Sequence, residues 1–557
     1  MRDGTGFGAD GGEAGRTAGE LDPTTAARVD QVAPTGRREP RRRHQVAQGR
    51  LPRALAAFAL HALSFVGWFI DDAFITMRYG HNLASGHGMV FNLGERVEGY
   101  TDFTWVLLAA LSLRLGVDPT LSFPIAGVVC VLGTVASVFA TGGRLSRLDA
   151  PGAAWGGTIA AGLVATATGA AVYAVTGLET MLFTLLTTLG MTALLERRTA
   201  RFAVCIGLAF LTRPEAALLG VFGAVWLCAR ALLRRAPWRE LATGVAILGA
   251  IVVPYLGWKL SYFGSIVPNT LYAKAPDRSA GWQYLWPPLA ATAGLAAASL
   301  ASLRSRDRRS QVGFFLALWM LWVLAVWWEG GDWMPSIRLL VPGIPFVALA
   351  ADGEILDWLL AARRRPTRAA LGAAAVLVLA PWIVWNLRDH QTARTHFVVT
   401  ETGVVPLMRL THALVRARVT SAALVDIGEV GYRTGWRIVD LTGLVDPVIG
   451  RSPGRHGDKH FPIAHFAAAR PDVVVIRSES PPKLVPGRPT AVAIPALWSV
   501  ETWLSSSEWF QTNYRYVCSV PVTGHYTLVL MERADRARAA RPLGGPGCHP
   551  LIIPPRR

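Results

Sequence analysis

The chain has 557 residues, of which 52% are hydrophobic and only 17% are charged, whereas about 25% of the residues of a typical soluble domain are charged. This composition, with its long apolar runs, excludes an ordinary soluble protein and favours an integral membrane protein. The net charge of +18 does not indicate a nucleic-acid partner, because the basic residues form short arginine clusters between apolar runs. Anionic membrane lipid is their expected neighbour.

The first segment, residues 1–50, is rich in Gly, Ala and Arg and has no apolar periodicity, so it is predicted to be a disordered basic tail. Residues 51–387 then carry eleven apolar runs, which predict about eleven transmembrane helices. The runs lie near 53–70, 121–142, 154–175, 178–195, 201–212, 214–233, 241–262, 285–303, 311–328, 338–357 and 368–387. The stretch 103–116 is too short to cross a bilayer and is expected to lie along the interface.

The arginine clusters predict the topology. They fall at 144–147, 197–201, 230–239, 304–309 and 363–368, all on one side of the membrane if 103–116 does not span. By the positive-inside rule this side is the cytoplasm, with the N-terminus on it and the C-terminus outside. The loops 71–120, 176–179, 212–215, 265–274 and 329–338 then meet at the outer face of the plasma membrane. A functional site is expected there.

Residues 69–88 read FIDDAFITMRYGHNLASGHG and place two adjacent carboxylates, Asp71 and Asp72, where the first apolar run ends. A carboxylate at the centre of a bilayer costs roughly 2.5–3.5 kcal/mol, so the pair is expected at the lipid boundary. One aspartate is explained as the N-cap of an interfacial helix. The pair favours a general base whose neighbour tunes it or binds a cation.

The stretch GERVEGYTDFTW at 94–105 adds carboxylates beside aromatic rings. Its candidate substrate-binding residues are Glu98, Tyr100 and Asp102. Carboxylates accept hydrogen bonds from sugar hydroxyls, and aromatic rings stack on the C–H faces of sugars, so the pattern suits a carbohydrate. A solvated loop with interfacial aromatic residues is the alternative.

Two further outer loops carry charges close to the membrane. TGLE places Glu179 at the start of a helix, where it complements the helix dipole or contacts a substrate. TRPE places Arg213 and Glu215 on either side of a proline between two apolar runs. Charges at such depth are costly and indicate a functional site, unless these two residues simply pair with each other.

The last two outer loops bring cations to the outer face, against the positive-inside trend. SIVPNTLYAK contains the candidates Asn269, Tyr272 and Lys274. EGGDWMPSIR contains the candidates Asp332, Trp333 and Arg338. A bound phosphate would account for these cations, because charge-assisted contacts to phosphate are strong. Snorkelling of long side chains to the surface is the alternative.

From about residue 388 the pattern changes to short strand-like runs: ALVDIG, RIVDL, PDVVVIRS and YTLVLMER. They predict a small α/β or α+β extracytoplasmic domain over 388–535, followed by a disordered end, 536–557. This domain is expected to grip a glycan acceptor or to cover the catalytic cavity. Its histidines His456, His460 and His465 suit either a metal site or, more simply, a polar loop.

Five motifs together resemble a known family: DDAFITMRYGHNLASGHGMVFNLGERVEGYTD, TGLET, FLTRPE, VPNTLYAK and GDWMPSIRLLVPGIPF. The sequence resembles the polyprenyl-phosphate-dependent membrane glycosyltransferases of the C-type (GT-C) fold. Among these it is most similar to the actinobacterial terminal β-(1→2) arabinofuranosyltransferases of cell-wall arabinan. The resemblance covers most of residues 55–360 and continues into VDIGEVGYRTGWRIVDLTGLVDP at 425–447.

The resemblance implies a GT-C glycosyltransferase that takes a lipid-linked donor such as decaprenyl-phosphoryl-arabinofuranose. The sugar would pass, with inversion, to a hydroxyl of a cell-wall glycan acceptor. It makes Asp71 the base and Asp72 its paired carboxylate, and it matches Lys274 and Arg338 to positions suited to the donor phosphate. Arg213 is a third candidate for binding this phosphate. It implies no certain cofactor; some relatives bind a divalent cation, and the sequence leaves the metal open.

Other functions stay open at this point. A mannosyltransferase or another polyprenyl-phosphosugar transferase is the first alternative. A membrane transporter is disfavoured, because transporters place polar residues near the middle of the membrane, whereas these polar motifs sit at one face. A non-catalytic scaffold is disfavoured by the retained aspartate pair and outer cations.

Overall fold

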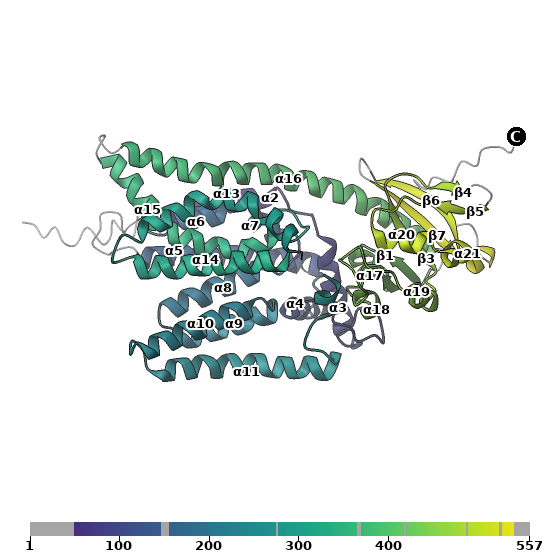
Figure 1. Ribbon diagram of the computed structural model, residues 1–557, viewed down its shortest axis with the longest axis horizontal. Helices are drawn as coiled ribbons and strands as arrows, with labels where there is room; N and C mark the ends of the chain where they lie inside the picture. The colour runs from purple at the N-terminus through teal and green to yellow at the C-terminus, as the bar shows by residue number, and fades with distance from the viewer. Residues whose placement is uncertain are drawn as a thin grey trace, which may run out of the picture. The chain divides into compact units, whose positions relative to one another are not determined.

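The computed structural model describes residues 49–145, 155–274, 277–364, 369–416, 419–485, 488–522 and 526–539. Within them a helical part is followed by a C-terminal part that contains the strands (Figure 1). Most of the predicted tail, 1–50, and of the predicted end, 536–557, lies outside the described residues. The domain limits at these two ends therefore stay predictions.

The helical part contains each predicted apolar run as one or two helices. Its helices are α2 (Arg50–Leu63), α3 (Asp71–Ala84), α4 (Phe103–Arg114), α5 (Pro119–Leu145), α6 (Thr158–Thr166), α7 (Thr168–Val175), α8 (Thr180–Leu195), α9 (Thr199–Thr212), α10 (Ala216–Leu232), α11 (Trp238–Phe263), α12 (Asn269–Ala273), α13 (Arg278–Ser302), α14 (Arg309–Glu329), the 3-10 helix η2 (Arg338–Gly343), α15 (Ile344–Arg364) and α16 (Ala369–Arg416).

Five described helical segments are long and apolar enough to cross a membrane: α5, α11, α14, Arg338–Arg363 and Ala369–His396. The bent pair α6 and α7 makes a sixth if it is one span. Helices α4, α8, α9 and α10 are apolar but shorter. With 12 residues, α4 reaches only about 18 Å, against about 30 Å of hydrocarbon. The predicted count of eleven spans remains a prediction.

The bend of 57° between α6 and α7 has a clear local cause. Ala167 leaves the helical conformation, with φ −65° and ψ 120°, so the first amide groups of α7 lose their helical partners. Asn386 of α16 replaces them: its Oδ1 accepts the Thr168 N–H at 2.7 Å, and its carbonyl accepts the Thr168 hydroxyl at 2.9 Å. A helix broken inside a membrane protein is tolerated where neighbouring helices satisfy its backbone in this way.

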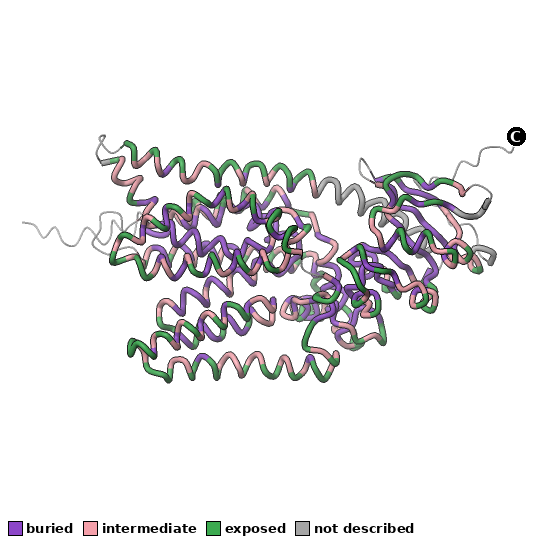
Figure 2. The backbone as a smooth tube through the Cα atoms, in the orientation of Figure 1, coloured by how far each residue is buried: buried purple, intermediate pink, exposed green. Residues whose placement is uncertain are grey.

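Burial divides the helices into central and peripheral ones (Figure 2). In the apolar window of Arg338–Arg363, 89% of the residues are buried, whereas in that of α11 only 6% are. An apolar helix with so little protein around it must face lipid for most of its surface. Helix α15 is therefore the centre of the bundle and α11 a peripheral helix.

Helix α16 does not stop at the end of its apolar run. It continues from Ala369 to Arg416, so the domain boundary expected at residue 388 falls inside a helix. Polar residues such as Arg388, Asp389 and His390 end the hydrophobic pattern there, but none of them breaks a helix. Its far end reaches β6 and α17 of the C-terminal part, so this helix links the two parts directly (Figure 1).

The C-terminal part is built on a five-stranded sheet in the order β2-β1-β3-β7-β6. Strand β1 is parallel to β2 and β3, and β7 is antiparallel to β3 and β6. This mixture of α and β elements matches the predicted class. The strands are β1 (Ser421–Leu424), β2 (Arg437–Asp440), β3 (Val473–Ser478), β6 (Tyr514–Val522) and β7 (Tyr526–Arg533), beside a hairpin of β4 (Lys483–Val485) and β5 (Arg488–Ala493). The helices are α17 (Gly428–Thr434), α18 (Pro447–Gly450), α19 (Ile463–Ala469), α20 (Ser499–Ser506), α21 (Glu508–Asn513) and α22 (Ala534–Ala539).

The two faces of this sheet belong to different hydrophobic cores, as alternation along a strand requires. In β3, Val474 and Ile476 pack with α19, α20 and α21. Val473 and Val475 face the other way and pack in one core with residues of α3 and of the loop after it, including Tyr79 and Phe91. The predicted first outer loop is therefore not free in solvent but forms part of the core of the C-terminal sheet.

Candidate functional site

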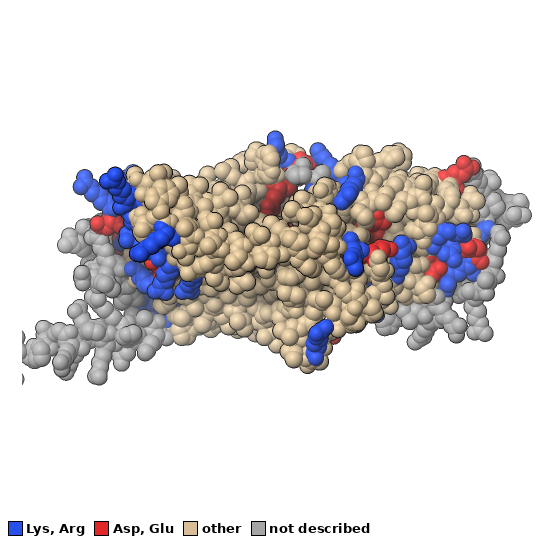
Figure 3. Space-filling view, turned by 90° about the horizontal axis from the view of Figure 1, so that it is seen from below, with Lys and Arg blue, Asp and Glu red and all other residues tan. Residues whose placement is uncertain are grey.

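A cavity of about 420 Å³ lies where the loops that were predicted to be outer meet, and nearly all of its wall comes from them. Its walls come from α3, the loop before α4, the starts of α8 and α10, α12, and the segment between α14 and η2. On the face drawn in Figure 3, acidic side chains are visible at the bottom of a hollow. The arginine clusters 197–201 and 304–309 lie at the opposite ends of α8 and α14 from the cavity residues Glu179 and Glu329.

Three charged side chains in the cavity stand without close partners in the described residues: Asp72, Glu329 and Lys274. Asp72 belongs to the first turn of α3, and Lys274 follows α12. Within the described residues neither side chain makes a hydrogen bond or an ion pair, although Lys274 is close enough to act on the Asp72 carboxylate. Burial raises the pKa of Asp72 above its usual value, while Lys274 and Arg338 oppose the shift. A carboxylate with a raised pKa is a stronger base.

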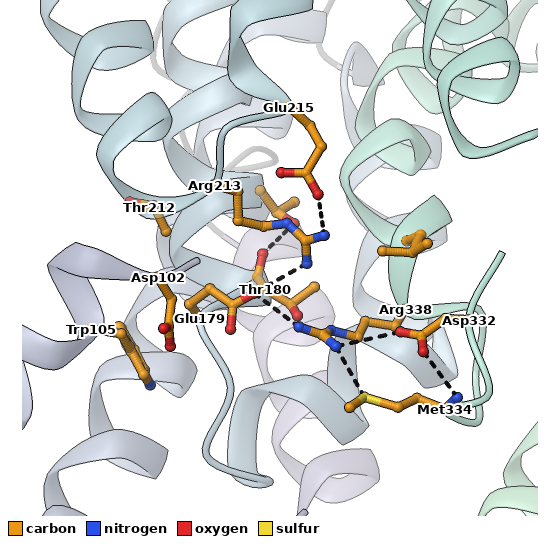
Figure 4. Close-up of polar contacts among 12 residues, drawn as sticks. Asp102, Trp105, Glu179, Thr180, Thr212, Arg213, Glu215, Asp332, Met334 and Arg338 are labelled. Carbon is orange, nitrogen blue, oxygen red and sulfur yellow. Dashed lines mark hydrogen bonds and ion pairs between the residues drawn. The ribbon is translucent and has the colours of Figure 1, made fainter. Parts of the chain in front are cut away.

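The two arginines of the cavity are, in contrast, firmly paired (Figure 4). Glu179 Oε1 accepts from Arg213 Nη1 and from Arg338 Nη2, each at 3.1 Å. Arg213 also pairs with Glu215, and Arg338 lies 3.4 Å from Asp332. Burial alone would raise the pKa of Glu179, but Arg338 and Arg213 outweigh it and hold this pKa below its usual value. Glu179 therefore keeps its charge and holds both guanidinium groups in place.

Two carboxylates fix the wall formed by residues 98–102. Asp102 Oδ2 accepts the Thr76 hydroxyl at 2.7 Å, which links this wall to α3. Glu98 lies outside the cavity lining and pairs with Lys259 of α11 at 2.9 Å, with both side chains buried. Burial raises the pKa of Glu98 to about 7, despite the opposing charge of Lys259. This pair attaches the wall to a helix that is otherwise hardly buried.

Asp71 has different surroundings from its neighbour Asp72. Its carboxylate accepts the backbone N–H groups of Gly428 and Glu429 at 2.7 and 2.9 Å, at the start of α17 in the C-terminal part. Burial and the nearby carboxylate of Asp426 raise the pKa of Asp71 to about 8, against the effect of these hydrogen bonds. Among the described residues that line the cavity, Asp72 is present and Asp71 is not.

The structure brings most of the predicted site residues together. The cavity is lined by the predicted residues Asp72, Tyr100, Asp102, Glu179, Arg213, Glu215, Lys274, Asp332 and Arg338. The other predicted residues lie outside its lining: Asp71, Glu98, Asn269, Tyr272 and Trp333. Tyr272 is partly exposed beneath the guanidinium of Arg451, and the exposed ring of Trp333 lies near His396. Asn269 is buried against the C-terminal part.

The lining also contains residues that were not among the predicted site residues. Glu329 opens the predicted outer loop EGGDWMPSIR and Trp328 directly precedes it, so the place of both in the sequence was a usable signal. Leu444 comes from the C-terminal part and follows the strand-like run RIVDL. No local pattern marks a leucine in a turn as part of a distant cavity, so this residue had no signal.

The histidine loop of the C-terminal part is spread out. His465 pairs with Asp446 at 2.8 Å, His456 lies beside the Trp498 ring, and His460 lies beside the Trp503 ring. In the described part of the chain no three His, Cys, Asp or Glu side chains form a group suited to a metal ion. The divalent cation stays as the resemblance left it, and the proposed transfer does not depend on one.

Comparison with curated proteins finds two relatives of the same description. The chain is 29% identical over 404 residues to a terminal beta-(1->2)-arabinofuranosyltransferase of Mycobacterium tuberculosis, which covers 61% of this chain and 61% of that protein. It is 27% identical over 336 residues to a terminal beta-(1->2)-arabinofuranosyltransferase of Corynebacterium glutamicum, covering 49% of this chain and 46% of that protein. The chain thus matches about three fifths or less of the length of these relatives.

Comparison with solved structures concerns the fold. The crystal structure of ArnT from Cupriavidus metallidurans bound to undecaprenyl phosphate matches with a TM-score of 0.52 at 13% identity, over 87% of this chain and 97% of that one. A family model described as a domain of unknown function (DUF8728) matches residues 408–530. The predicted class is confirmed: the chain is a mainly helical, multi-pass membrane protein with a GT-C-like fold and a C-terminal mixed α/β region.

Proposed function

We propose that this protein is a glycosyltransferase that moves a sugar from a polyprenyl-phosphate donor to a hydroxyl of a cell-wall glycan at the outer membrane face. One observation carries the proposal: Asp72 and Lys274 line the same cavity, Lys274 is close enough to act on the Asp72 carboxylate, and neither has a close partner in the described residues. A reaction that removes a proton from an acceptor and releases a phosphate needs one group of each kind.

Asp72 is the group that we assign as the base. It lines the cavity, and its raised pKa suits it to take a proton from a hydroxyl. The resemblance assigns this role to Asp71, but the carboxylate oxygens of Asp71 accept two backbone N–H groups and lie away from the cavity lining. The geometry therefore favours Asp72, with Asp71 beside it in a supporting role.

Lys274 is the first candidate for the donor phosphate, and the arginine pair supports it. Arg338 and Arg213 line the same cavity, and their network with Glu179 keeps them fixed before a substrate arrives. Fixed cations that face a leaving phosphate stabilise its charge without reorganisation. Trp328 lines the cavity and also exposes 57% of its surface at the end of α14. The cavity therefore reaches the exposed surface at the end of the apolar helix α14, where we place the prenyl tail.

The transfer then follows from the positions of these groups. The acceptor hydroxyl gives its proton to Asp72, and its oxygen forms a bond to the anomeric carbon of the donor sugar. The bond from that carbon to the phosphate oxygen breaks on the opposite face, so the configuration inverts. The polyprenyl phosphate leaves with the electron pair of this bond, and Lys274 and Arg338 stabilise its charge. Arabinofuranose is the proposed sugar, supported by the similarity to the two arabinofuranosyltransferases.

The test is a transfer assay with the purified protein in lipid. Polyprenyl-phosphoryl-arabinofuranose and a synthetic arabinan acceptor are supplied, with polyprenyl-phosphoryl-mannose as the alternative donor in parallel. We expect transfer of arabinofuranose by the wild type. Asp72→Asn should lower kcat by about 10²–10⁴-fold, the usual share of a general base, and leave donor binding intact. A loss of kcat with Asp71→Asn but not with Asp72→Asn would return the base role to Asp71.

A further inference from the structure

We infer that the C-terminal domain, residues 419–539, positions the transfer site: its backbone holds Asp71 and Asn269 and so fixes the two cavity walls that carry Asp72 and Lys274. The catalytic consequence of this inference rests on the proposed function. Its structural consequence, that the two walls loosen when the contacts are lost, does not.

The first contact is made by α17. The N–H groups of Gly428 and Glu429 both donate to the Asp71 carboxylate, across 357 and 358 residues of sequence. The approach is close, because a Cβ added to Gly428 would lie only 1.9 Å from the Asp71 carbonyl oxygen. Asp71 is the first residue of α3, and Asp72 is the second. The place of α17 therefore decides where the Asp72 carboxylate points.

The second contact is made by the turn after β2. Asn269 Nδ2 donates to the carbonyl oxygens of Gly443 and Leu444, at 2.8 and 2.9 Å. Leu444 itself lines the cavity. Asn269 is the first residue of the short helix α12, and Lys274 is its C-cap. A five-residue helix is too short to be stable alone, so its position, and that of Lys274, depends on what holds its ends.

Two buried side chains of the first outer loop strengthen the same interface. Arg78 donates to the carbonyl oxygens of Gly431, Gly435 and Trp436, as well as to that of Phe91. Asn92 exchanges two hydrogen bonds with Ile438, at 2.8 and 2.9 Å, as a neighbouring strand would on the free edge of β2. The apolar core that the sheet shares with Tyr79 lies beneath them. The domain is therefore joined to this loop over a broad and buried interface.

The two contacts predict different kinetic effects, because they serve different walls. Gly428→Ala pushes Asp71 away and should lower kcat by about ten- to hundredfold, since a displacement of about 1 Å can cost this much. The KM for the donor should hardly change. Asn269→Asp keeps the size of the side chain but loses both donated hydrogen bonds. It should raise the KM for the donor by about two- to tenfold, since it loosens the segment that carries Lys274.

The matched control is an exposed ion pair across the same interface. Arg437 and Glu95 form an ion pair at 2.9 Å whose side chains are 50% and 35% exposed. Exposed pairs contribute little, so Arg437→Ala should change neither kinetic constant. All variants are compared with the wild type in lipid nanodiscs. Hydrogen–deuterium exchange is measured on peptides from 71–84 and 268–274, and from the sheet as a check that the domain is folded.

The inference is supported if Gly428→Ala speeds exchange in 71–84 and Asn269→Asp speeds it in 268–274, each by about two- to tenfold, while Arg437→Ala changes neither. Unchanged exchange in a folded variant overturns it, as does faster exchange with unchanged kinetics. If Gly428→Ala does not fold, Asn269→Asp and Asp71→Asn decide the question. If exchange changes as expected but the wild type transfers no sugar, the two contacts stand and the proposed function fails.

Discussion

The cavity contains two sets of charged side chains that differ in what they contact. Glu179, Arg213 and Arg338 are buried and form ion pairs with one another and with Glu215 and Asp332. Asp72 and Lys274, like Glu329, have no close partner in the described residues. A buried charge without a partner costs several kcal/mol, so the first set is explained by the stability of the site. The second set is explained only by what enters the cavity. Substitutions in the first set should therefore change stability, and those in the second should change activity.

The largest effect is expected from Glu179→Gln. This change leaves Arg213 and Arg338 facing each other with one carboxylate fewer, and breaking a buried pair costs about 3–5 kcal/mol of unfolding free energy. The measurement is the unfolding midpoint of the purified protein in detergent, followed by tryptophan fluorescence. A midpoint equal to that of the wild type would mean that the arginines do not depend on Glu179.

The pair of Glu98 and Lys259 tests the same rule away from the cavity lining. Lys259→Met should cost less, about 1–3 kcal/mol, because Glu98 can become neutral by taking a proton. The pKa of Glu98 is already raised to about 7 in the folded protein, and losing Lys259 raises it further, while the unfolded value is about 4.3. Such a group stabilises the fold at low pH and loses that contribution as pH rises through the folded pKa. The variant should therefore be less stable at pH 8 than at pH 5.5.

A matched double variant separates this effect from a simple packing defect. Glu98→Leu combined with Lys259→Met removes both charges and should recover part of the lost stability at pH 8. Its stability should also depend less on pH than that of Lys259→Met alone. A double variant that is less stable than both single variants would show that packing, and not charge, dominates at this position.

Lys274→Met belongs to the second set and should behave in the opposite way. The side chain has no ion pair in the described residues, so its loss should leave the free energy of unfolding within about 0.5 kcal/mol of that of the wild type. The KM for the donor should rise by about 10- to 100-fold, as expected when a charge-assisted contact to phosphate of about 1.5–3 kcal/mol is lost. Lys274→Arg is the control and should recover part of the affinity. An unchanged KM would remove Lys274 from the phosphate site.

Sequence reasoning located the charges but not their partners. Asp72, Glu179, Arg213 and Arg338 were identifiable because each lies at an end of an apolar run, where a charge is costly without a reason. Lys274 was identifiable because it goes against the positive-inside trend. Which aspartate of the pair faces the cavity was not identifiable. Adjacent residues of a helix point about 100° apart, and only the docking of α17 against Asp71 decides which one is free.

The fold shows the same contrast between features with a local sequence pattern and features set by distant contacts. The long apolar runs and the strands β1, β2, β3 and β7 have strong local patterns, and the sequence predicted them. It did not predict β6, whose run YRYVCSVPV alternates poorly and is broken by an irregularity between Tyr516 and Cys518. Nor did it predict that one sheet face would pack on the first outer loop. This contact joins segments more than 300 residues apart and leaves no periodicity in either of them.

The smallest effect concerns pH and sharpens the contrast between the two aspartates. If Asp72 is the base, the rate falls as pH drops through its pKa, because the protonated carboxyl cannot accept the hydroxyl proton. Burial raises this pKa, so the acid limb of kcat should lie above the usual value of about 3.9.

Lys274 opposes the shift in the Asp72 pKa, and Lys274→Met should therefore move the acid limb to higher pH. Asp426→Asn should move it to lower pH, because the charge of Asp426 raises the pKa of Asp72. An acid limb that both variants leave in place would separate the rate from Asp72, whatever their effect on kcat.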